Sequence, residues 1–309
     1  MTMSKQQTNH QKTDIAITGL WALLPRQTHP YISVMRLDRP IGWWLLLLPN
    51  WWVILAKAST ITDAVTMMVL FLIGAIVMRA AGCVINDLLD RDIDKHIART
   101  ATRPIASGEI SMLKAFTLLG VLGAIGLAIL IQLPIKAWIM GLMSLPFIAC
   151  YPLFKRFTYW PQAMLGVTFS WGVLLGHVAI TDSWPDLQVI ILYLGSIFWV
   201  IGYDTIYAIQ DMKDDEISGV KSSALAMKSN IARGVGFFYT LAIIILSIGF
   251  YLNFGLSYWF IGLFLMGCHL IWQLRQIDEE NPQKALFLFK SNRDAGLILS
   301  AALLLELMI

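Results

Sequence analysis

The sequence predicts an all-α, polytopic membrane protein, a bundle of nine transmembrane helices. Its 309 residues are 57% hydrophobic and only 14% charged, with a mean hydropathy of +0.67, whereas a soluble domain carries roughly 25% charged residues. The apolar residues form long blocks with little amphipathic period, which indicates that lipid is the solvent. Lys and Arg are distributed unevenly around these blocks.

Nine apolar blocks are candidate spans. Several are shorter than the ~20 residues that cross ~30 Å of hydrocarbon, and the last contains Glu306. We expect a cytoplasmic N-terminal segment at 1–35 and a nine-helix intramembrane domain at 36–309. The candidate spans lie near 40–57, 64–86, 113–132, 135–152, 162–180, 187–210, 233–252, 255–273 and 292–309.

The positions of Lys and Arg predict the orientation. With a cytoplasmic N-terminus, 21 of the 23 basic residues fall on the cytoplasmic side, and only Lys57 and Lys136 fall on the other. This asymmetry is typical of cytoplasmic loops, and we expect a bacterial-type inner (plasma) membrane. Residues 1–35 lack the apolar core of a signal peptide. We expect no nucleic-acid partner, and the sequence does not indicate protein partners.

The three cysteines do not have the spacing of a metal site. Cys83, Cys150 and Cys268 lie within or at the ends of apolar blocks. We expect them to be small buried residues without a disulfide.

A first acidic cluster follows the second apolar block, in the stretch 82–109. Asp87, Asp90 and Asp94 stand at i, i+3 and i+7 and share one face of a helix, whereas Asp92 points elsewhere. A divalent cation such as Mg²⁺ would relieve their repulsion. Nearby basic side chains could bind an anion, and a solvated helix end with local ion pairs is the alternative. The basic residues are Arg79, Arg91, Lys95, Arg99, Arg103 and Lys114.

A second acidic cluster ends the sixth span. Asp204, Asp211 and Asp215 stand at i, i+7 and i+11, again on one helix face. Spans 2 and 6 run in the same direction, so both clusters should reach the same side of the membrane. The layout indicates a degenerate repeat whose two facing clusters hold Mg²⁺ around one diphosphate. A solvated helix C-terminus is the alternative, although acids there oppose the helix dipole.

Several segments resemble one family. Asn86-Asp87-x-x-Asp90-x-x-x-Asp94 and Asp211-x-x-x-Asp215 resemble the two Asp motifs of the UbiA-type intramembrane prenyltransferases. Three further segments fit the same family, and two more are similar to the branch that prenylates 4-hydroxybenzoate. The first three are Arg36-Leu-Asp-Arg39-Pro40-Ile-Gly, Arg79-Ala-Ala-Gly-Cys and Arg99-Thr-x-x-Arg103-Pro104. The last two are Tyr151-Pro-x-x-Lys155-Arg156-x-Thr158-x-x-Pro161-Gln162 and Tyr203-Asp-Thr-x-Tyr207-Ala.

The resemblance implies that the nine helices surround a large central cavity that is open laterally to lipid, and it implies a Mg²⁺-dependent reaction. A polyprenyl group would pass from its diphosphate to the ring of 4-hydroxybenzoate, ortho to the hydroxyl, with release of diphosphate, in ubiquinone biosynthesis. The metal ligands would be Asp87, Asp90, Asp94, Asp211 and Asp215. The diphosphate would contact Asn86, Arg36, Arg39, Arg79, Arg103, Lys155 and Lys221.

The acceptor needs an anchor and a base. The fork-shaped head of Arg156 suits a carboxylate, although Lys155 and Arg156 equally fit a positively charged cytoplasmic loop. Asp211, or else Asp204, would take the phenol or ring proton. Three tyrosines would either face the acceptor and the prenyl cation or simply pack in the bundle. They are Tyr151, Tyr203 and Tyr207.

Two alternatives remain open from the sequence. One is a prenyltransferase for another acceptor, such as a dihydroxynaphthoate, homogentisate or haem. The other is a membrane transporter that uses the acids as an ion path. We interpret His177 and His269 as hydrogen-bonded groups between helices, and we assign no role to Asp92.

Overall fold

The computed structural model of the chain describes residues 19–96 and 100–309, and within them we find helices and turns and no β-strand. The described residues form two compact units, one of residues 19–40 and 76–127 and the other of residues 41–75 and 128–309. Helix α3 (Ile61–Leu89) contributes to both units.

The first unit contains the C-terminal part of α3, from residue 76 to Leu89. A small hydrophobic core joins α1, α3, the segment before α5 and α5 itself, through residues such as Val34, Val84 and Ile110. Most of α5 is exposed, with Leu113 at 78% and Phe116 at 56%, as suits a helix that faces lipid. The other elements are η1 (Gly19–Leu23), η2 (Arg26–Thr28), α1 (His29–Val34), α4 (Arg91–Asp94) and α5 (Met112–Leu130).

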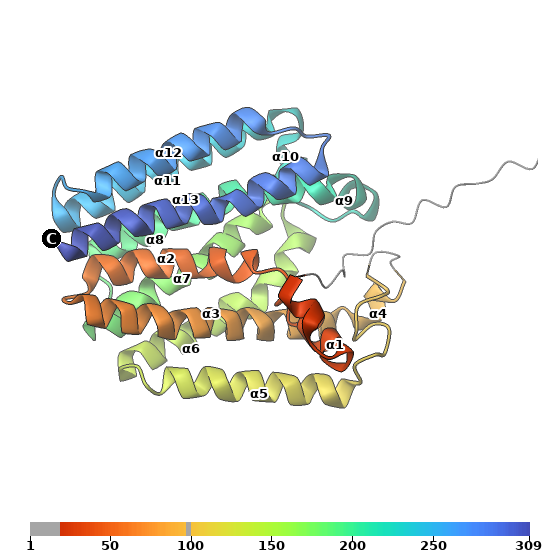
Figure 1. Cartoon of the computed structure of the whole chain (residues 1–309). Helices are drawn as coiled ribbons and strands as arrows, with labels where there is room; N and C mark the ends of the chain where they lie inside the picture. The colour runs from red at the N-terminus through yellow and green to blue at the C-terminus, as the bar shows by residue number, and fades with distance from the viewer. Residues whose placement is uncertain (1–18, 97–99) are drawn as a thin grey trace, which may run out of the picture. The chain divides into compact units, whose positions relative to one another are not determined.

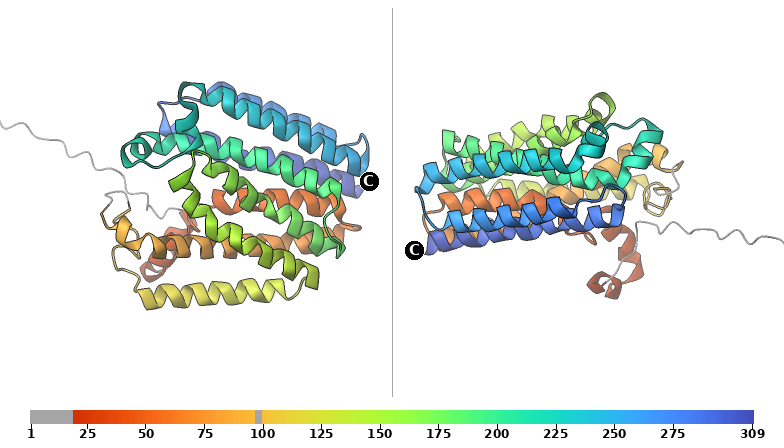
Figure 2. Two further views of the ribbon diagram at one scale, coloured as in Figure 1. Left: turned by 180° about the vertical axis from the view of Figure 1, so that it is seen from behind. Right: turned by 90° about the horizontal axis from the view of Figure 1, so that it is seen from above.

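The second unit is a bundle of long helices (Figure 1). Helix α8 packs on α7 and α11, and α13 packs on α2 and α12; the same neighbours lie side by side in both views of Figure 2. Its elements are α2 (Ile41–Lys57), α6 (Ile135–Phe157), α7 (Pro161–Thr181), α8 (Leu187–Ala208), η3 (Ile209–Asp211), α9 (Met212–Ser218), α10 (Ser223–Met227), η4 (Lys228–Asn230), α11 (Ile231–Phe254), α12 (Trp259–Gln276) and α13 (Pro282–Met308).

A glycine sets the close approach of α8 to α11. A Cβ atom at Gly202 would lie 2.4 Å from Cε1 of Tyr239, so the tyrosine ring fills the space that any other residue would need. The Tyr239 hydroxyl donates to Gln273 Oε1 at 2.8 Å, and the Trp199 indole donates to Asn292 Oδ1 at 3.2 Å. These bonds join α8, α11, α12 and α13 inside the bundle and satisfy polar groups that lie away from water.

The two histidines behave differently. His269 Nε2 on α12 lies 3.3 Å from Ser291 Oγ on α13, which confirms the prediction of an interhelical contact. His177 Nε2 instead contacts Thr181 and Ser183, in its own helix and the loop that follows. The prediction of an interhelical contact for His177 is therefore wrong, because the loop after α7 folds back over its last turn.

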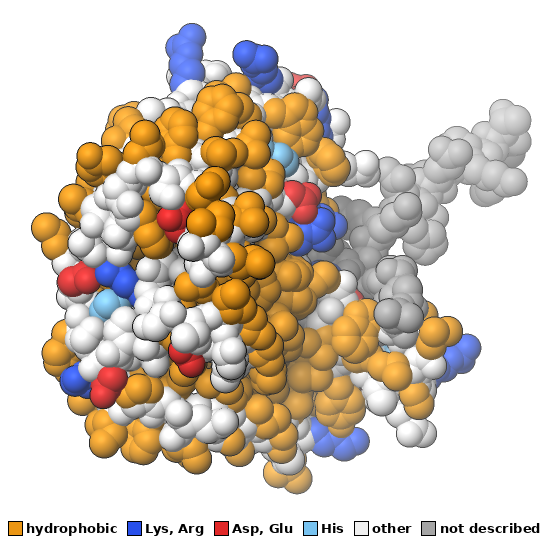
Figure 3. All heavy atoms as spheres, turned by 60° about the vertical axis from the view of Figure 1, so that its left-hand side comes forward, with side chains coloured by type: hydrophobic (Ala, Val, Ile, Leu, Met, Phe, Trp, Pro, Cys, Tyr) orange, Lys and Arg blue, Asp and Glu red, His pale blue; other side chains and the backbone are white. Residues whose placement is uncertain are grey.

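The prediction of membrane-spanning helices is confirmed. In the described part of the chain, five helical segments are long and apolar enough to cross a bilayer, and two shorter apolar helices accompany them. Nine helices of at least 17 residues overlap the nine predicted ranges in those same residues; that all nine span the bilayer stays a prediction. Figure 3 shows extensive hydrophobic side chains on an outer face, with scattered charges.

Two details differ from the sequence prediction. Helix α13 begins at Pro282, ten residues before the predicted 292, because Asn281 caps it through a 3.0 Å hydrogen bond from the Lys284 amide. Cys83 is buried, but Cys150 and Cys268 are exposed. Lipid solvates the outer face of a membrane helix, so apolar side chains there need no protein cover.

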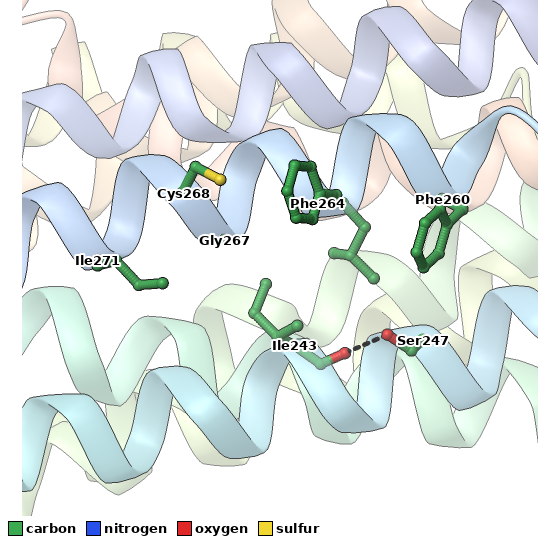
Figure 4. Close-up of a pocket in the computed structure, with 8 residues that line it drawn as sticks. Ile243, Ser247, Phe260, Phe264, Gly267, Cys268 and Ile271 are labelled. Atoms are coloured by element: carbon green, nitrogen blue, oxygen red, sulfur yellow. Dashed lines mark hydrogen bonds between the residues drawn. The ribbon is translucent and has the colours of Figure 1, made fainter.

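A shallow apolar groove of about 250 Å³ lies between α11 and α12 (Figure 4). Its one hydroxyl, on Ser247, donates to the Ile243 carbonyl at 2.7 Å. The groove contains no residue of the predicted site. It is lined by Ile243, Ser247, Phe260, Leu263, Phe264, Gly267, Cys268 and Ile271.

Candidate active site

The first acidic motif lies at a break between two helices. Helix α3 ends at Leu89, and Asp90 (φ −90°, ψ 1°) precedes α4. The Asp90 amide still donates to the Asn86 carbonyl at 2.9 Å, and the Asp94 amide donates to the Asp90 carbonyl at 2.8 Å. The predicted continuous helix is therefore interrupted at Asp90, yet the path remains close enough to helical to keep Asp87 and Asp94 on one side.

Two arginines bind these two carboxylates. Arg36 Nη2 lies 3.1 and 3.2 Å from the two Asp87 oxygens. Arg103 Nη1 lies 2.8 Å from Asp94 Oδ2 and 3.3 Å from Asp87 Oδ1. Asp87 and Asp94 are only 2% and 4% exposed, and buried charges of this kind need partners. The structure thus brings together four of the predicted site residues in the first unit.

The backbone of Arg36 is in the left-handed region, with φ +55°. This conformation is costly for a residue with a side chain. Its guanidinium also donates to the Ser33 carbonyl at 2.6 Å, which fixes the side chain over the end of α1. Backbone strain at Arg36 therefore coincides with a side chain that reaches Asp87.

Sequence reasoning missed two supporting residues in this unit. Asp38 has a side chain that is 5% exposed and accepts from Arg39 Nε at 3.1 Å. The hydroxyl of Thr100 donates to the Asp94 carbonyl at 3.1 Å. The sequence did contain a signal for Asp38, because it is an acid that stands between Arg36 and Arg39. It contained no signal for Thr100.

The remaining predicted residues of the first unit lie near this cluster in sequence. Asn86 and Arg79 are half-buried on α3, and Asp90 is half-buried at the break. Asp92 points away, as predicted: its side chain is 83% exposed and lies 2.9 Å from Lys95 Nζ. The hydrogen bond from Lys95 lowers the pKa of Asp92 below its usual value. Arg99 lies outside the described residues.

The second acidic motif also lies at a break. Helix α8 ends at Ala208, η3 follows, and Asp211 (φ −105°, ψ 1°) precedes α9, which contains Asp215. The predicted continuous helix is therefore interrupted at Asp211: Asp204 and Asp211 lie on the segment 187–211, and Asp215 lies on the short helix beyond the break. A negative charge is unfavourable at a helix C-terminus, and the break places Asp215 on a new short helix instead of at the C-terminus of α8.

The two motifs have the same local architecture. Asp90 and Asp211 both lie in the sparsely populated bridge region that many active-site residues adopt, immediately before a short helix. Asp94 and Asp215 each follow four residues later. In this alignment Ala208 stands where Asp87 stands in the first motif. The shared break is consistent with the predicted degenerate repeat.

A buried hydrogen-bond network anchors the segment after the second motif. Gln162 Oε1 accepts from the Ser223 amide at 3.0 Å, and the Ser223 hydroxyl lies 2.7 Å from Thr205 Oγ1. All three residues are buried. Lys221, predicted to bind diphosphate, donates to the Phe157 carbonyl at 3.3 Å and lies 5.3 Å from the centre of the Tyr159 ring. The segment that follows Asp215 is therefore tied to the end of α6, the start of α7 and α8.

The candidate acceptor residues have different environments. Tyr203 is 1% exposed, and its ring packs 5.0 Å from Trp199, which favours the packing interpretation. Tyr207 is 40% exposed, with its ring 4.6 Å from Phe289. Tyr151 is half-buried against the main core. Asp204, Asp211 and Asp215 are half-buried. The side chains of Lys155 and Arg156 lie outside the described residues.

The donor chemistry of this chain fits a hard divalent cation. Among the described residues, no three His, Cys, Asp or Glu side chains are grouped as ready-made metal ligands. Asp87 and Asp94 are nevertheless two buried carboxylates whose oxygens converge on the same nitrogen of Arg103. Mg²⁺ typically takes one or two carboxylates and completes its shell with water and substrate phosphates.

Comparison with known proteins places this site in context. The model of the UbiA prenyltransferase family matches residues 46–293. The chain is 42% identical over 291 residues to the mitochondrial 4-hydroxybenzoate polyprenyltransferase of Saccharomyces cerevisiae, covering 92% of this chain and 77% of that one. It is 41% identical over 282 residues to the human mitochondrial enzyme of the same name (91% and 76%). It is 40% identical over 282 residues to a 4-hydroxybenzoate geranyltransferase of Lithospermum erythrorhizon (91% and 92%).

Solved structures share the fold. A UbiA homologue from Aeropyrum pernix K1 in its apo form matches with a TM-score of 0.67 at 24% identity, covering 93% of this chain and 100% of that one. A UbiA homologue from Archaeoglobus fulgidus bound to GPP and Mg²⁺ matches with a TM-score of 0.61 at 18% identity, covering 91% and 100%. The match of the family model over most of the chain decides between an enzyme and a transporter. The chain belongs to the UbiA prenyltransferase family.

Proposed function

We propose that this protein transfers a polyprenyl group from polyprenyl diphosphate to 4-hydroxybenzoate, ortho to the hydroxyl, and releases diphosphate in ubiquinone biosynthesis. The observation that carries the proposal is the identity of 40–42%, over about nine tenths of the chain, to enzymes named for prenyl transfer to 4-hydroxybenzoate. The acid and arginine cluster of the first unit supplies chemistry that suits a metal-bound diphosphate.

The chain's own residues would stabilise the leaving group. Arg36 and Arg103 would donate to phosphate oxygens through charge-assisted hydrogen bonds, and further donors would complete the shell. Mg²⁺, held by the motif carboxylates, would supply Lewis-acid stabilisation of the departing diphosphate. The proposed ligands are Asp87, Asp90, Asp94, Asp211 and Asp215, and the further donors are Asn86, Arg39, Arg79, Lys155 and Lys221. The archaeal homologue solved with GPP and Mg²⁺ supports the proposal that a prenyl diphosphate and Mg²⁺ bind together.

Acceptor binding would involve the second unit. Arg156 would hold the carboxylate of 4-hydroxybenzoate, and Tyr207, which is partly exposed, would face the acceptor or the prenyl cation. Asp211, or alternatively Asp204, would take the proton from the phenol or ring. Tyr151 and Tyr203 would shape the wall behind them.

The membrane setting follows from the same proposal. Residues 36–309 would form one intramembrane domain of nine spans whose cavity opens to lipid, and residues 1–35 would be a cytoplasmic segment. Both Asp motifs would lie on the cytoplasmic side of a bacterial-type inner membrane, because 21 of 23 basic residues fall on that side of the proposed topology. A scan of engineered single cysteines with an impermeant maleimide would test this orientation.

A direct assay tests the proposed reaction. Membranes that contain the protein are incubated with 4-hydroxybenzoate, a polyprenyl diphosphate and Mg²⁺, and the products are separated by chromatography and identified by mass spectrometry. We expect a 3-polyprenyl-4-hydroxybenzoate that disappears with EDTA and returns with Mg²⁺. Parallel reactions with a dihydroxynaphthoate, homogentisate and haem examine acceptor choice. Prenylation of one of these, with none of 4-hydroxybenzoate, would overturn the proposed acceptor.

A further inference from the structure

The four charged residues at the first motif form an electrically neutral cluster without any metal. Two carboxylates, Asp87 and Asp94, meet two guanidinium groups, Arg36 and Arg103. The carboxylates are almost fully buried, and the side chains of Arg36 and Arg103 are only 16% and 22% exposed. The arginines therefore occupy the positions around these oxygens that a metal ion would otherwise use.

We propose that Arg36 and Arg103 act as internal substitutes for the metal ion, so that the motif binds a divalent cation strongly only together with a diphosphate. A cation that arrived alone would have to displace both guanidinium groups and leave them without partners in a partly buried place, which is unfavourable. A diphosphate that arrives with the cation offers the guanidinium groups new anionic partners. This inference rests on the proposed function and adds to it that the cation and the diphosphate bind together.

The geometry predicts that Arg103 affects binding of the divalent cation more than Arg36 does. Its Nη1 contacts both carboxylates, at 2.8 Å to Asp94 and 3.3 Å to Asp87, so one side chain closes the space between them. In the described residues of this unit, Arg36 contacts Asp87 and not Asp94, and its Nη1 donates to the Ser33 carbonyl. Exchange of partners by Arg103 therefore removes a contact from both acids and leaves Asp94 without its guanidinium, whereas exchange by Arg36 removes contacts from Asp87 alone, which Arg103 still holds.

The exchange gives each arginine two roles with opposite effects. Without diphosphate it competes with the metal for carboxylate oxygens. With diphosphate it helps to hold the anion. A neutral replacement should therefore strengthen binding of the metal alone and weaken binding of the diphosphate. An arginine that served only as a phosphate ligand, or only as a structural ion pair, would not produce both changes.

The test measures binding and does not depend on turnover. The purified full chain is titrated at pH 8 with Mn²⁺, a paramagnetic substitute for Mg²⁺ whose free form is quantified by EPR. We expect Arg103→Gln to bind Mn²⁺ about tenfold more tightly than the wild type, the equivalent of one charge-assisted hydrogen bond, and Arg36→Gln to show a smaller gain. Arg103→Lys, which keeps the charge, should remain close to the wild type.

A second titration uses inorganic diphosphate at saturating Mn²⁺, measured against the same mixture without protein. Arg103→Gln should bind diphosphate more weakly than the wild type. Lys95→Gln is the matched control, because it removes a charge of the same loop that pairs with Asp92 and not with the motif acids. It should change neither titration.

The outcomes separate this inference from the proposed function. Unchanged or weaker Mn²⁺ binding in both glutamine variants would overturn the inference, provided that each variant elutes as the wild type does in size-exclusion chromatography. If neither variant folds, the wild type decides: diphosphate must raise its Mn²⁺ affinity, and an equal affinity with and without diphosphate would overturn the inference. A wild type that binds no diphosphate at any Mn²⁺ concentration would instead count against the proposed function itself.

Discussion

Gln162 Oε1 accepts a hydrogen bond from the Ser223 backbone amide at 3.0 Å, across 61 residues of sequence. The bond is buried, and the Ser223 hydroxyl continues the network to Thr205 on α8. Gln162 and Thr205 belong to the two segments that resemble the 4-hydroxybenzoate branch most closely. Their hydrogen bonds hold Ser223, in the chain that follows the second acidic motif, eight residues after Asp215.

Removing this anchor should loosen the second motif. Gln162→Leu leaves the buried backbone N–H of Ser223 without its acceptor, which costs about 1–3 kcal/mol. We expect faster hydrogen exchange in residues 212–224 and lower turnover. Gln188→Leu is the matched control, since Gln188 bonds Lys57 and the Leu252 carbonyl in another part of the same unit. If exchange in 212–224 rises equally in both variants, the anchoring role of Gln162 is wrong.

The acids of the first motif should differ sharply in their importance. Asp87→Asn keeps the shape of the side chain but removes a buried charge, and we expect turnover to fall by about a hundredfold or more. Asp92→Asn, at an exposed side chain paired with Lys95, should leave turnover within about twofold. Product formation in membranes that contain equal amounts of inserted protein provides the measurement. Full activity of Asp87→Asn would remove the metal role that we assign to it.

The role of Asp211 can be resolved by varying the metal concentration. If Asp211 is a metal ligand, Asp211→Asn should need more Mg²⁺ for half-maximal turnover, and excess Mg²⁺ should restore part of the rate. If it is the base, the rate should fall without any change in the Mg²⁺ requirement. Glu216→Gln, at an exposed residue paired with Lys228, serves as the control. Wild-type kinetics in Asp211→Asn would contradict both roles.

Asp186 predicts a pH-dependent contribution to stability. Partial burial acts to raise the pKa of Asp186, but hydrogen bonds from the Val189 amide and Lys57, with the charge of Lys57, outweigh it and leave the pKa below its usual value. The ionised carboxylate therefore stabilises the folded state above about pH 4, and this contribution is lost as the pH falls through the folded-state pKa.

Asp186→Asn should accordingly lower the Tm at pH 7 but not below the folded-state pKa. Asparagine can still cap α8, so the change isolates the charge, and solvent screening keeps its effect below about 1 kcal/mol. Thermal unfolding in detergent at pH 7, 5 and 3 measures the difference between variant and wild type. In a Lys57→Gln background the same change should have less effect. A difference that grows on acidification would contradict this assignment.

The sequence predicted the membrane class, the ranges of the long helices and both acidic motifs, because hydropathy blocks and aspartate spacing are local signals. It did not predict the breaks at Asp90 and Asp211, since neither has a neighbouring Gly or Pro to mark it. Nor could it predict that Arg36 reaches Asp87 or that Gln162 reaches Ser223. Those partners are 51 and 61 residues apart, and only tertiary packing decides which side chains meet.

The left-handed backbone of Arg36 sets a limit on how this protein can be stabilised. Glycine adopts that conformation without strain, so Arg36→Gly should relieve about 1–2 kcal/mol of local backbone energy. The same change removes a guanidinium that faces a buried acid. Removing one partner of a buried ion pair is strongly destabilising, so relief of the backbone strain does not make glycine a stabilising choice here. Selection for heat resistance alone should therefore keep Arg36, and Arg36→Gly should lower the Tm.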